Sequence, residues 1–293
     1  MSDSKRLFYL FFLELNRTLF KKRFAAEFDV TDRCNLSCLH CYNHFTDEPI
    51  REEIHVETWE KRFDDMYGSG VRLVQLMGGE PTLRMDVVEL AIKKFPFVYI
   101  STNGLIRIPR EWKVKIILSI DGTKEKNDRI RGKGVFEKAV NNYSGDNRVL
   151  INMVLNTDNY TDLEDVVMMA KRNNFAGVLC NIYSTTTDQR EERICGKERK
   201  TIISEMRRVR SMYPEAFLMN EMMIRWFEDG DHTNRCHWRE NAYHLNVDWI
   251  SRTCYIDRPD CSNCGCMAGA LQRPLQMIRY PMDLIRIVRI GKG

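Results

Sequence analysis

Six short apolar runs, each followed by a longer amphipathic stretch, set the main limit on how this 293-residue chain can fold. The runs have the length of strands, and the stretches between them have the period of helices. This alternation is typical of βαβ units in a parallel sheet. The predicted strands cover residues 24–30, 71–77, 97–101, 115–120, 149–155 and 177–183.

Helices are expected between these strands, near residues 56–68, 85–95, 135–143, 161–173 and 197–213. Such repeats build either an open doubly wound sheet or an incomplete barrel, and in both the chemistry lies at the carboxyl ends of the strands. Cys34 follows the first predicted strand, Gly78 and Gly79 end the second, Asn103 ends the third and Asp121 ends the fourth. We therefore expect these residues to converge on one rim.

The composition is that of a globular protein, with 43% hydrophobic and 29% charged residues and no apolar run of about 20 residues. The formal net charge of +4 is spread without a long block of one sign, so no nucleic-acid partner is expected. Lys5 and Arg6 precede an apolar run as in an export signal, but Glu14 interrupts it and no small-residue cleavage site follows. We expect a cytoplasmic protein whose residues 1–23 form an amphipathic helix.

Three cysteines lie within eight residues of one another in the run RCNLSCLHCYN, directly after the first predicted strand. An iron–sulfur cube normally takes four thiolates, so Cys34, Cys38 and Cys41 would leave one iron open. An open coordination position is where a substrate or cofactor binds a metal. The alternative is a structural zinc or cluster site that a distant ligand such as His40 or His44 completes.

The spacing C-x3-C-x2-C resembles the cluster loop of the radical S-adenosylmethionine (SAM) enzymes. Three more motifs follow in the order of that superfamily, namely MGGEP (77–81), STNG (101–104) and SIDGTKEKNDRIRGKGVFEKA (119–139). The resemblance covers roughly residues 24–183. It implies an α/β fold with a partial (β/α)6 TIM-like barrel.

The resemblance also implies that Cys34, Cys38 and Cys41 are catalytic ligands of a [4Fe–4S] cluster whose open iron binds SAM. Backbone near the glycines of MGGEP would receive the methionine amino group, since glycine lets a backbone approach a ligand closely. A guanidinium fork suits the SAM carboxylate, and an imidazole stands where the family usually has an aromatic ring beside adenine. The residues that the resemblance assigns to SAM are His40, Gly78, Gly79, Glu80, Thr102, Asn103, Ser119 and Arg131.

The chemistry implied is a one-electron cleavage of SAM to methionine and a 5′-deoxyadenosyl radical, which attacks a C–H bond or a double bond. The cofactor carries that chemistry, and the protein holds the reacting atoms and keeps competing groups out. An external one-electron donor such as flavodoxin or ferredoxin is the implied partner.

Beyond Pro214 the pattern changes to a helix-like stretch (216–228), a hairpin within residues 242–256 and a cluster of five cysteines. We therefore divide the chain into residues 1–23, a barrel at 24–213 and a second domain at 214–293.

The five C-terminal cysteines predict a second metal site, since a reducing compartment does not favour disulfides. The arrangement resembles the shortened auxiliary-cluster domain called twitch, related to the longer SPASM domain, of some radical SAM enzymes. This implies an auxiliary [4Fe–4S] cluster on Cys236, Cys254, Cys261 and Cys264, with Cys266 as a substitute ligand or a spare thiol. The alternative is a structural zinc.

Three functions remain open. The first is hydrogen abstraction from a peptide or small natural product, followed by oxidation or rearrangement. The second is addition of the adenosyl radical to an isoprenoid lipid alkene, because the short region at 103–115 and the CGC run resemble relatives of the hopanoid adenosyl-adding enzyme. The third is a cysteine-rich metal-binding interaction module.

Two interpretations remain open for each of four further features, the two terminal segments and two isolated cysteines. The apolar terminal segments at 7–20 and 275–290 either touch a membrane surface weakly or pack on the barrel. Cys180, in a predicted strand, and Cys195 are either ordinary cysteines or donors of a hydrogen atom to a substrate radical.

Overall fold

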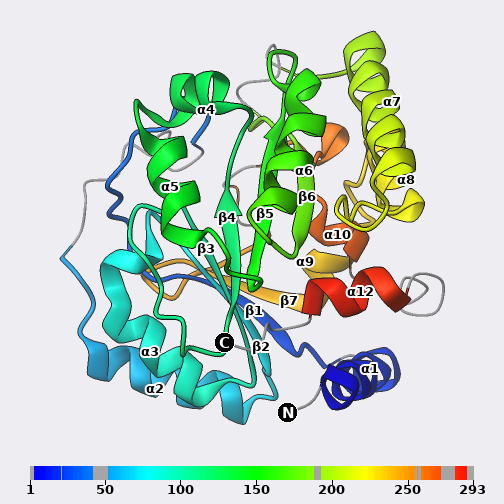
Figure 1. Cartoon of the computed structure of the whole chain (residues 1–293). Coiled ribbons are helices and arrows are strands. Elements are labelled where there is room, and N and C mark those ends of the chain that lie inside the picture. Colours follow the sequence, from blue (N-terminus) through cyan, green and yellow to red (C-terminus); the bar gives the residue numbers. More distant parts are fainter. Residues whose placement is uncertain are drawn as a thin grey trace.

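In the part of the chain that the computed structural model describes, the strands form one eight-stranded sheet in the order β6-β5-β4-β3-β2-β1-β7-β8 (Figure 1). That part comprises residues 3–20, 22–41, 52–187, 193–254, 256, 259–271 and 281–288. Strands β1 to β6 are parallel neighbours in chain order. This is the arrangement of a partial (β/α)6 barrel, as the sequence predicts.

All six predicted strands are confirmed, with ends that differ by at most two residues. Strands β1, β4, β5 and β6 are buried on both faces over most of their length. Strand β2 alternates between half-buried and buried residues. Their bounds are β1 Ala25–Asp29, β2 Leu73–Met77, β3 Phe97–Thr102, β4 Lys115–Ser119, β5 Val149–Leu155 and β6 Gly177–Ile182.

The predicted barrel helices are also present, and they cover the outside of the sheet (Figure 1). Helix α4 (Lys124–Arg131) is an addition. Only Asn127 and Arg131 of this helix are buried, so it has no apolar period to detect. The others are α2 Val56–Gly68, α3 Met85–Lys94, α5 Val135–Tyr143, α6 Leu163–Arg172 and α7 Gly196–Met212, with short 3-10 turns at Pro81–Arg84, Tyr160–Asp162 and Cys261–Asn263.

The connection from β3 to β4, residues 103–114, contains no helix, in agreement with its short length. The Arg148 side chain holds it in place from the start of β5. Its Nη1 donates to the carbonyl oxygens of Pro109 and Trp112, at 2.7 Å each. Asp146 in turn pairs with Arg148 Nη2 at 2.6 Å. The short crossover is thus held by a buried ion pair through two of its carbonyl groups.

The C-terminal region carries the predicted hairpin, with β7 (Ala242–Leu245) antiparallel to β8 (Ser251–Arg252). The helix expected from residue 216 begins later, because Asn220 caps α8 (Glu221–Asp229) by accepting the Met223 N–H at 3.1 Å. The remaining helices are α9 His237–Asn241, α10 Ala268–Leu271 and α12 Pro281–Val288.

This C-terminal region contacts both edges of the six-stranded barrel sheet. Strand β7 pairs with β1 in parallel, so the sheet continues without a break (Figure 1). At the other edge, Pro259 bridges to Thr186, and the Ile182 N–H donates to the Gly265 carbonyl oxygen at 2.9 Å. The region therefore covers the side that six strands leave open. The division at residue 214 stays a prediction, although the two parts share one sheet.

Helix α1 (Asp3–Phe20) covers the amino ends of the strands (Figure 1). Tyr9 stacks on Phe97, the first residue of β3, with ring centroids 5.8 Å apart. Leu13 packs against a small cluster that includes Phe24 and Ala25. Helix α1 also contacts α12. None of the described helices is both long and apolar enough to cross a membrane.

Candidate active site

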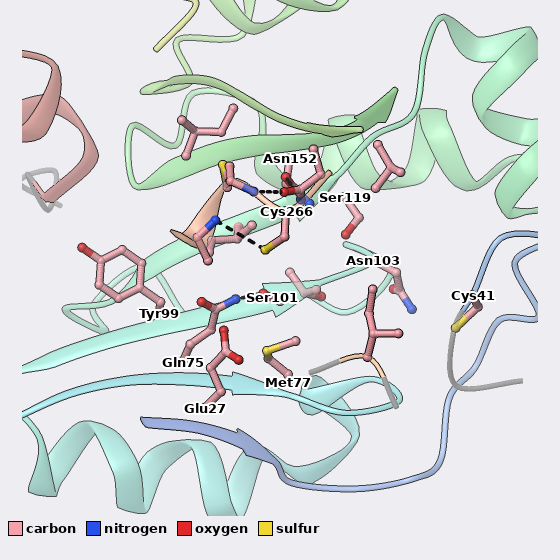
Figure 2. A pocket seen from close by; sticks show the side chains of 18 of the residues that line it. Glu27, Cys41, Gln75, Met77, Tyr99, Ser101, Asn103, Ser119, Asn152 and Cys266 are labelled. Carbon is pink, nitrogen blue, oxygen red and sulfur yellow. Dashed lines mark hydrogen bonds between the residues drawn. The ribbon is translucent and has the colours of Figure 1, made fainter. Parts of the chain in front are cut away.

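A cavity of about 390 Å³ opens at the carboxyl ends of the strands and extends into the barrel. Figure 2 shows Cys41 at one end, Gln75 and Tyr99 toward the other, and Cys266 between them. Every residue predicted for the first cluster or for SAM lines this cavity. These residues are Cys34, Cys38, His40, Cys41, Gly78, Gly79, Glu80, Thr102, Asn103, Ser119 and Arg131. The structure thus brings them together, while their individual roles stay predictions.

The two glycines of MGGEP let two loops touch. The Gly79 N–H donates to the Thr31 carbonyl oxygen at 2.7 Å, and the Glu80 N–H donates to the Arg33 carbonyl oxygen at 2.9 Å. A Cβ atom on Gly78 would lie 2.3 Å from the Thr31 oxygen, and one on Gly79 would lie 2.1 Å from the Arg33 oxygen. Gly78 also has a φ of +117°. The close approach that requires glycine here is therefore to the start of the cysteine loop.

The Glu80 carboxylate ties the end of β2 to the end of β3. It is buried and accepts the Thr102 hydroxyl at 2.8 Å and the Asn103 N–H at 2.8 Å. It also accepts the hydroxyl of Thr82 at 2.6 Å. Asn103 Nδ2 then donates to Asn35 Oδ1 at 2.7 Å, which reaches the cysteine loop. Glu80 thus positions Thr102 and Asn103 as well as lining the cavity.

Arg131 pairs with Asp121, a carboxylate that the sequence placed on the rim without a role. The Arg131 Nε atom lies 2.6 Å from Asp121 Oδ2 in an ion pair rather than an aligned hydrogen bond, and Asp121 is fully buried. His40 Nε2 lies 3.5 Å from the same oxygen. Burial lowers the pKa of His40 despite the opposing effect of Asp121, so its imidazole is neutral near pH 7.

The three thiols of the cysteine loop line the cavity. Burial raises the pKa of Cys34 and of Cys38, while the positive charge of Arg131 acts in the opposite direction at Cys38. All ten cysteines are described, and all carry thiols. In the described part of the chain, no three His, Cys, Asp or Glu side chains form a site for a single metal ion. Three adjacent thiols facing a cavity large enough for a nucleoside fit a cluster with SAM on its open iron.

The barrel interior carries polar side chains that the sequence analysis missed. Gln75 Nε2 donates to Ser101 Oγ at 2.9 Å (Figure 2). Asn181 Nδ2 donates to Asn152 Oδ1 at 3.0 Å. Glu27 lies beside them in the register, opposite Gln75. Gln75, Asn152 and Asn181 are each the one strongly polar residue of an otherwise apolar strand, and that signal in the sequence could have identified them. Ser101 and Glu27 share their strands with Thr102 and Asp29.

Glu27 also joins the cavity to the C-terminal region. It is 5% exposed, and its Oε2 lies 2.6 Å from Nδ1 of His244 on β7. This contact crosses between strands that are 217 residues apart in the sequence. We call the polar side chains inside the barrel the polar floor of the cavity, namely Glu27, Gln75, Ser101, Asn152 and Asn181. One of them, Glu27, is held by the C-terminal hairpin.

Among the predicted auxiliary cysteines, Cys264 lies beside the end of β6, where the carbonyl oxygen of Gly265 accepts the Ile182 N–H at 2.9 Å. Cys254 lines a small pocket with Glu27 and His244. Burial raises the pKa of Cys264 to about 12, and the neighbouring Cys236 and Cys261 also raise it. Burial raises the pKa of Cys254 as well, with Cys264 and Cys236 among the further causes. The charges of Cys264, Cys254 and Cys236 also raise the pKa of Cys266, so all five thiols lie near one another. A set of four thiolates would fit a closed cluster.

Arg199 of α7 holds the loop of Cys261 and Cys264, and no pattern in the sequence points to it. Its Nη2 donates to the Cys264 carbonyl oxygen at 2.6 Å, and its Nη1 donates to Asn263 Oδ1 at 3.0 Å. Its Nε donates to the Phe227 carbonyl oxygen at 2.7 Å. All three contacts use the planar fork of the guanidinium.

Cys266 differs from its four neighbours, because of these five thiols it is the one that lines the cavity in the described structure. Its backbone is fixed by Trp226, whose Nε1 donates to the Cys266 carbonyl oxygen at 3.0 Å. The two cysteines considered as hydrogen-atom donors lie elsewhere. Cys180 packs in the hydrophobic core, and Cys195 is exposed just before α7; neither is among the described residues that line the cavity.

Comparison with known proteins defines the class. The Radical SAM superfamily model matches residues 28–192, and the chain belongs to this superfamily of enzymes, which use a [4Fe–4S] cluster and SAM. Two curated relatives are similar. An Fe-coproporphyrin III synthase of Methanosarcina barkeri is 37% identical over 131 residues, 41% of this chain and 33% of that protein. Mycofactocin maturase MftC of Mycolicibacterium smegmatis is 31% identical over 161 residues, 49% of this chain and 41% of that protein.

The matched segments cover 33% and 41% of these two relatives, so this chain spans less than half the length of either. Among solved structures, Streptococcus suis SuiB bound to its precursor peptide SuiA matches with a TM-score of 0.64 and 14% identity, over 85% of this chain and 66% of that one. This likeness shows the fold, and it extends past the barrel. The resemblance to the hopanoid branch stays a prediction.

Proposed function

We propose that this protein is a peptide-modifying radical SAM enzyme that abstracts a hydrogen atom from its substrate and then completes an oxidation or rearrangement. One observation carries the proposal: a single cavity joins the three-cysteine loop to a polar floor and to Cys266. The structure of SuiB with a precursor peptide supports a peptide as substrate. A small natural product of similar polarity is the other substrate class of the same proposal.

The polar floor suits a peptide because it offers both donors and acceptors. Gln75, Asn152 and Asn181 present amide groups between apolar side chains such as Leu150 and Leu179. Amides of this kind pair with peptide N–H and C=O groups, which must keep hydrogen bonds once they leave water. These amides already bond to Ser101 or to one another, and a lipid alkene could use none of their further donor and acceptor positions.

When bound at Cys34, Cys38 and Cys41, the cluster with SAM would supply the 5′-deoxyadenosyl radical. The residues of this chain hold the reactants. Arg131, oriented by Asp121, supports the SAM carboxylate, and Glu80 fixes the strand ends that face the rest of SAM. Neutral His40 covers the adenine side. An external donor such as flavodoxin or ferredoxin provides the electron, and a cytoplasmic setting fits that supply.

We also propose that Cys236, Cys254, Cys261 and Cys264 hold an auxiliary [4Fe–4S] cluster and that Cys266 is not one of its ligands. The position of Cys266 on the cavity supports this division. Iron analysis after anaerobic reconstitution tests it. Cys264→Ala should lower the iron content by up to about four atoms per chain, whereas Cys266→Ala should leave it unchanged. Equal losses in both variants would contradict the division.

The reaction itself is tested with the reconstituted protein, SAM, a reductant and a set of candidate precursor peptides. Deoxyadenosine should form. One peptide should either lose hydrogen, which lowers its mass, or rearrange at constant mass, which changes its fragmentation pattern. Cys38→Ala should abolish both products, while the matched control Cys195→Ala, an exposed thiol outside the cavity, should retain them. A deoxyadenosine adduct on a lipid would instead support adenosyl addition.

A further inference from the structure

Helix α1 has two apolar faces, and only one of them packs on the protein. Tyr9 and Leu13 contact the strand ends, and Leu10 is buried. A second set lies on the opposite side at helical spacing i, i+3, i+4, i+7 and i+11. This set, called here the outer stripe, consists of Phe8, Phe11, Phe12, Leu15 and Leu19, which are 44% to 72% exposed.

The outer stripe is unusual for this molecule. In the described part of the chain, eleven large hydrophobic side chains are exposed, and six of them lie on α1, the five of the stripe and Phe20. Scattered single residues of this kind are ordinary, but a continuous row marks a surface that binds something apolar. From Phe8 to Leu19 the row is roughly 16 Å long at the rise of an α-helix.

The charge around the helix indicates what the stripe binds. Residues 1–23 contain six basic and two acidic residues, a formal charge of +4 that equals the net charge of the entire chain. Lys5, in the first turns of α1, and Lys22, just after its end, are both exposed. A row of Phe and Leu flanked by lysines is the combination that attracts a helix to an anionic lipid surface.

We propose that the outer stripe of α1 lies in the interface of an anionic lipid bilayer and that the flanking lysines face its headgroups. The inner face keeps the helix attached to the barrel through Tyr9 and Phe97. The protein would then bind the membrane with the amino ends of its strands, which leaves the three-cysteine loop at the far end open to an electron donor. The inference does not depend on the proposed reaction.

Co-sedimentation with vesicles tests this proposal on the full-length protein. The protein should sediment with vesicles that contain phosphatidylglycerol, and less with pure phosphatidylcholine. High salt should weaken the binding, because exposed charges are screened. Phe8→Ser with Phe12→Ser and Leu15→Ser should reduce the bound fraction by about tenfold or more, since the stripe supplies the buried apolar area.

Matched variants separate this effect from general loss of surface hydrophobicity. Met212→Ser with Ile250→Ser removes exposed apolar side chains far from α1 in the sequence and should not change binding. Lys5→Glu with Lys22→Glu should weaken binding to the anionic vesicles and not to the neutral ones. Lys197→Glu with Lys200→Glu, a charge control on exposed positions of α7, should have no effect.

Three results would overturn the proposal. One is no binding to anionic vesicles, and another is equal binding by the wild type and the stripe variant. The third is a dimer in light scattering that the stripe variant abolishes without lipid, which would assign the stripe to a second copy of the chain. Each is readable without SAM or peptide substrate, so a failure here is distinct from a failure of the proposed reaction.

Discussion

The carboxylate of Glu80 accepts the hydroxyl of Thr102 at 2.8 Å, across the ends of two neighbouring strands. This contact, with the Asn103 N–H at 2.8 Å on the other oxygen, fixes the geometry of the rim that faces the cysteine loop. If a neutral group replaces this buried carboxylate, the Thr102 hydroxyl and the Asn103 N–H keep only weaker hydrogen bonds.

Replacing Glu80 by Gln should therefore weaken SAM binding by about tenfold or more, since charge-assisted hydrogen bonds contribute about 1.5–3 kcal/mol each. Isothermal titration of SAM into the reconstituted protein measures the effect. Glu89→Gln is the control, because Glu89 pairs with Lys93 on the surface of α3 and such pairs contribute little. A Glu80→Gln affinity equal to that of Glu89→Gln would show that the carboxylate is not needed.

Gly79→Ala should displace the start of the cysteine loop, since the added methyl would lie 2.1 Å from the Arg33 oxygen. We expect the variant to fold but to hold less iron at the first site and to form little deoxyadenosine. Gly68→Ala provides the control, because a Cβ there meets nothing within 4 Å. Iron analysis and a deoxyadenosine assay of both variants decide the matter, and unchanged iron in Gly79→Ala would contradict the loop contact.

Arg199→Lys should selectively disturb the predicted auxiliary site, because lysine cannot reproduce three contacts made by one planar fork. We expect a loss of up to about four iron atoms per chain, with SAM binding retained. Arg225→Lys, which alters an exposed pair with Glu221 on α8, is the matched control. If Arg199→Lys instead lost SAM binding and kept its iron, this assignment would be wrong.

Asp29 should make stability depend on pH. Burial raises its pKa to about 7, against the opposing effect of Arg252. The folded state therefore holds this proton more tightly than the unfolded state, and the free energy of unfolding falls as the pH rises from about 4 to about 7. Asp29→Asn removes the titrating carboxyl group. The free energy of unfolding should then no longer fall over this pH range, a difference from the wild type of at most about 4 kcal/mol at neutral pH.

Urea unfolding followed by tryptophan fluorescence at pH 5 and pH 8 would measure this difference. The gain of Asp29→Asn over the wild type should be larger at pH 8. Asp65→Asn, an exposed position on α2, should change stability equally at both pH values. A gain from Asp29→Asn that does not grow with pH would refute the raised pKa.

The elements with a strong period, and the site residues close together in sequence, could be predicted from the chain alone. The barrel strands follow from their apolar runs, and Cys34, Cys38 and Cys41 from their spacing. Arg199 could not be found, since its partners lie 28, 64 and 65 residues later. Helix α4 was missed because its charged residues have no apolar face. The contact between Glu27 and His244 could not be predicted either, because only the register of β1 with β7 brings the two residues together.

The path of the last 80 residues has an energetic consequence. Because they hydrogen-bond to β1 at one edge and to the end of β6 at the other, neither part retains its full set of backbone partners without the other. We therefore expect a single cooperative melting transition for the 293-residue chain. A chain truncated after residue 213 should expose unpaired backbone groups at β1 and β6 and aggregate.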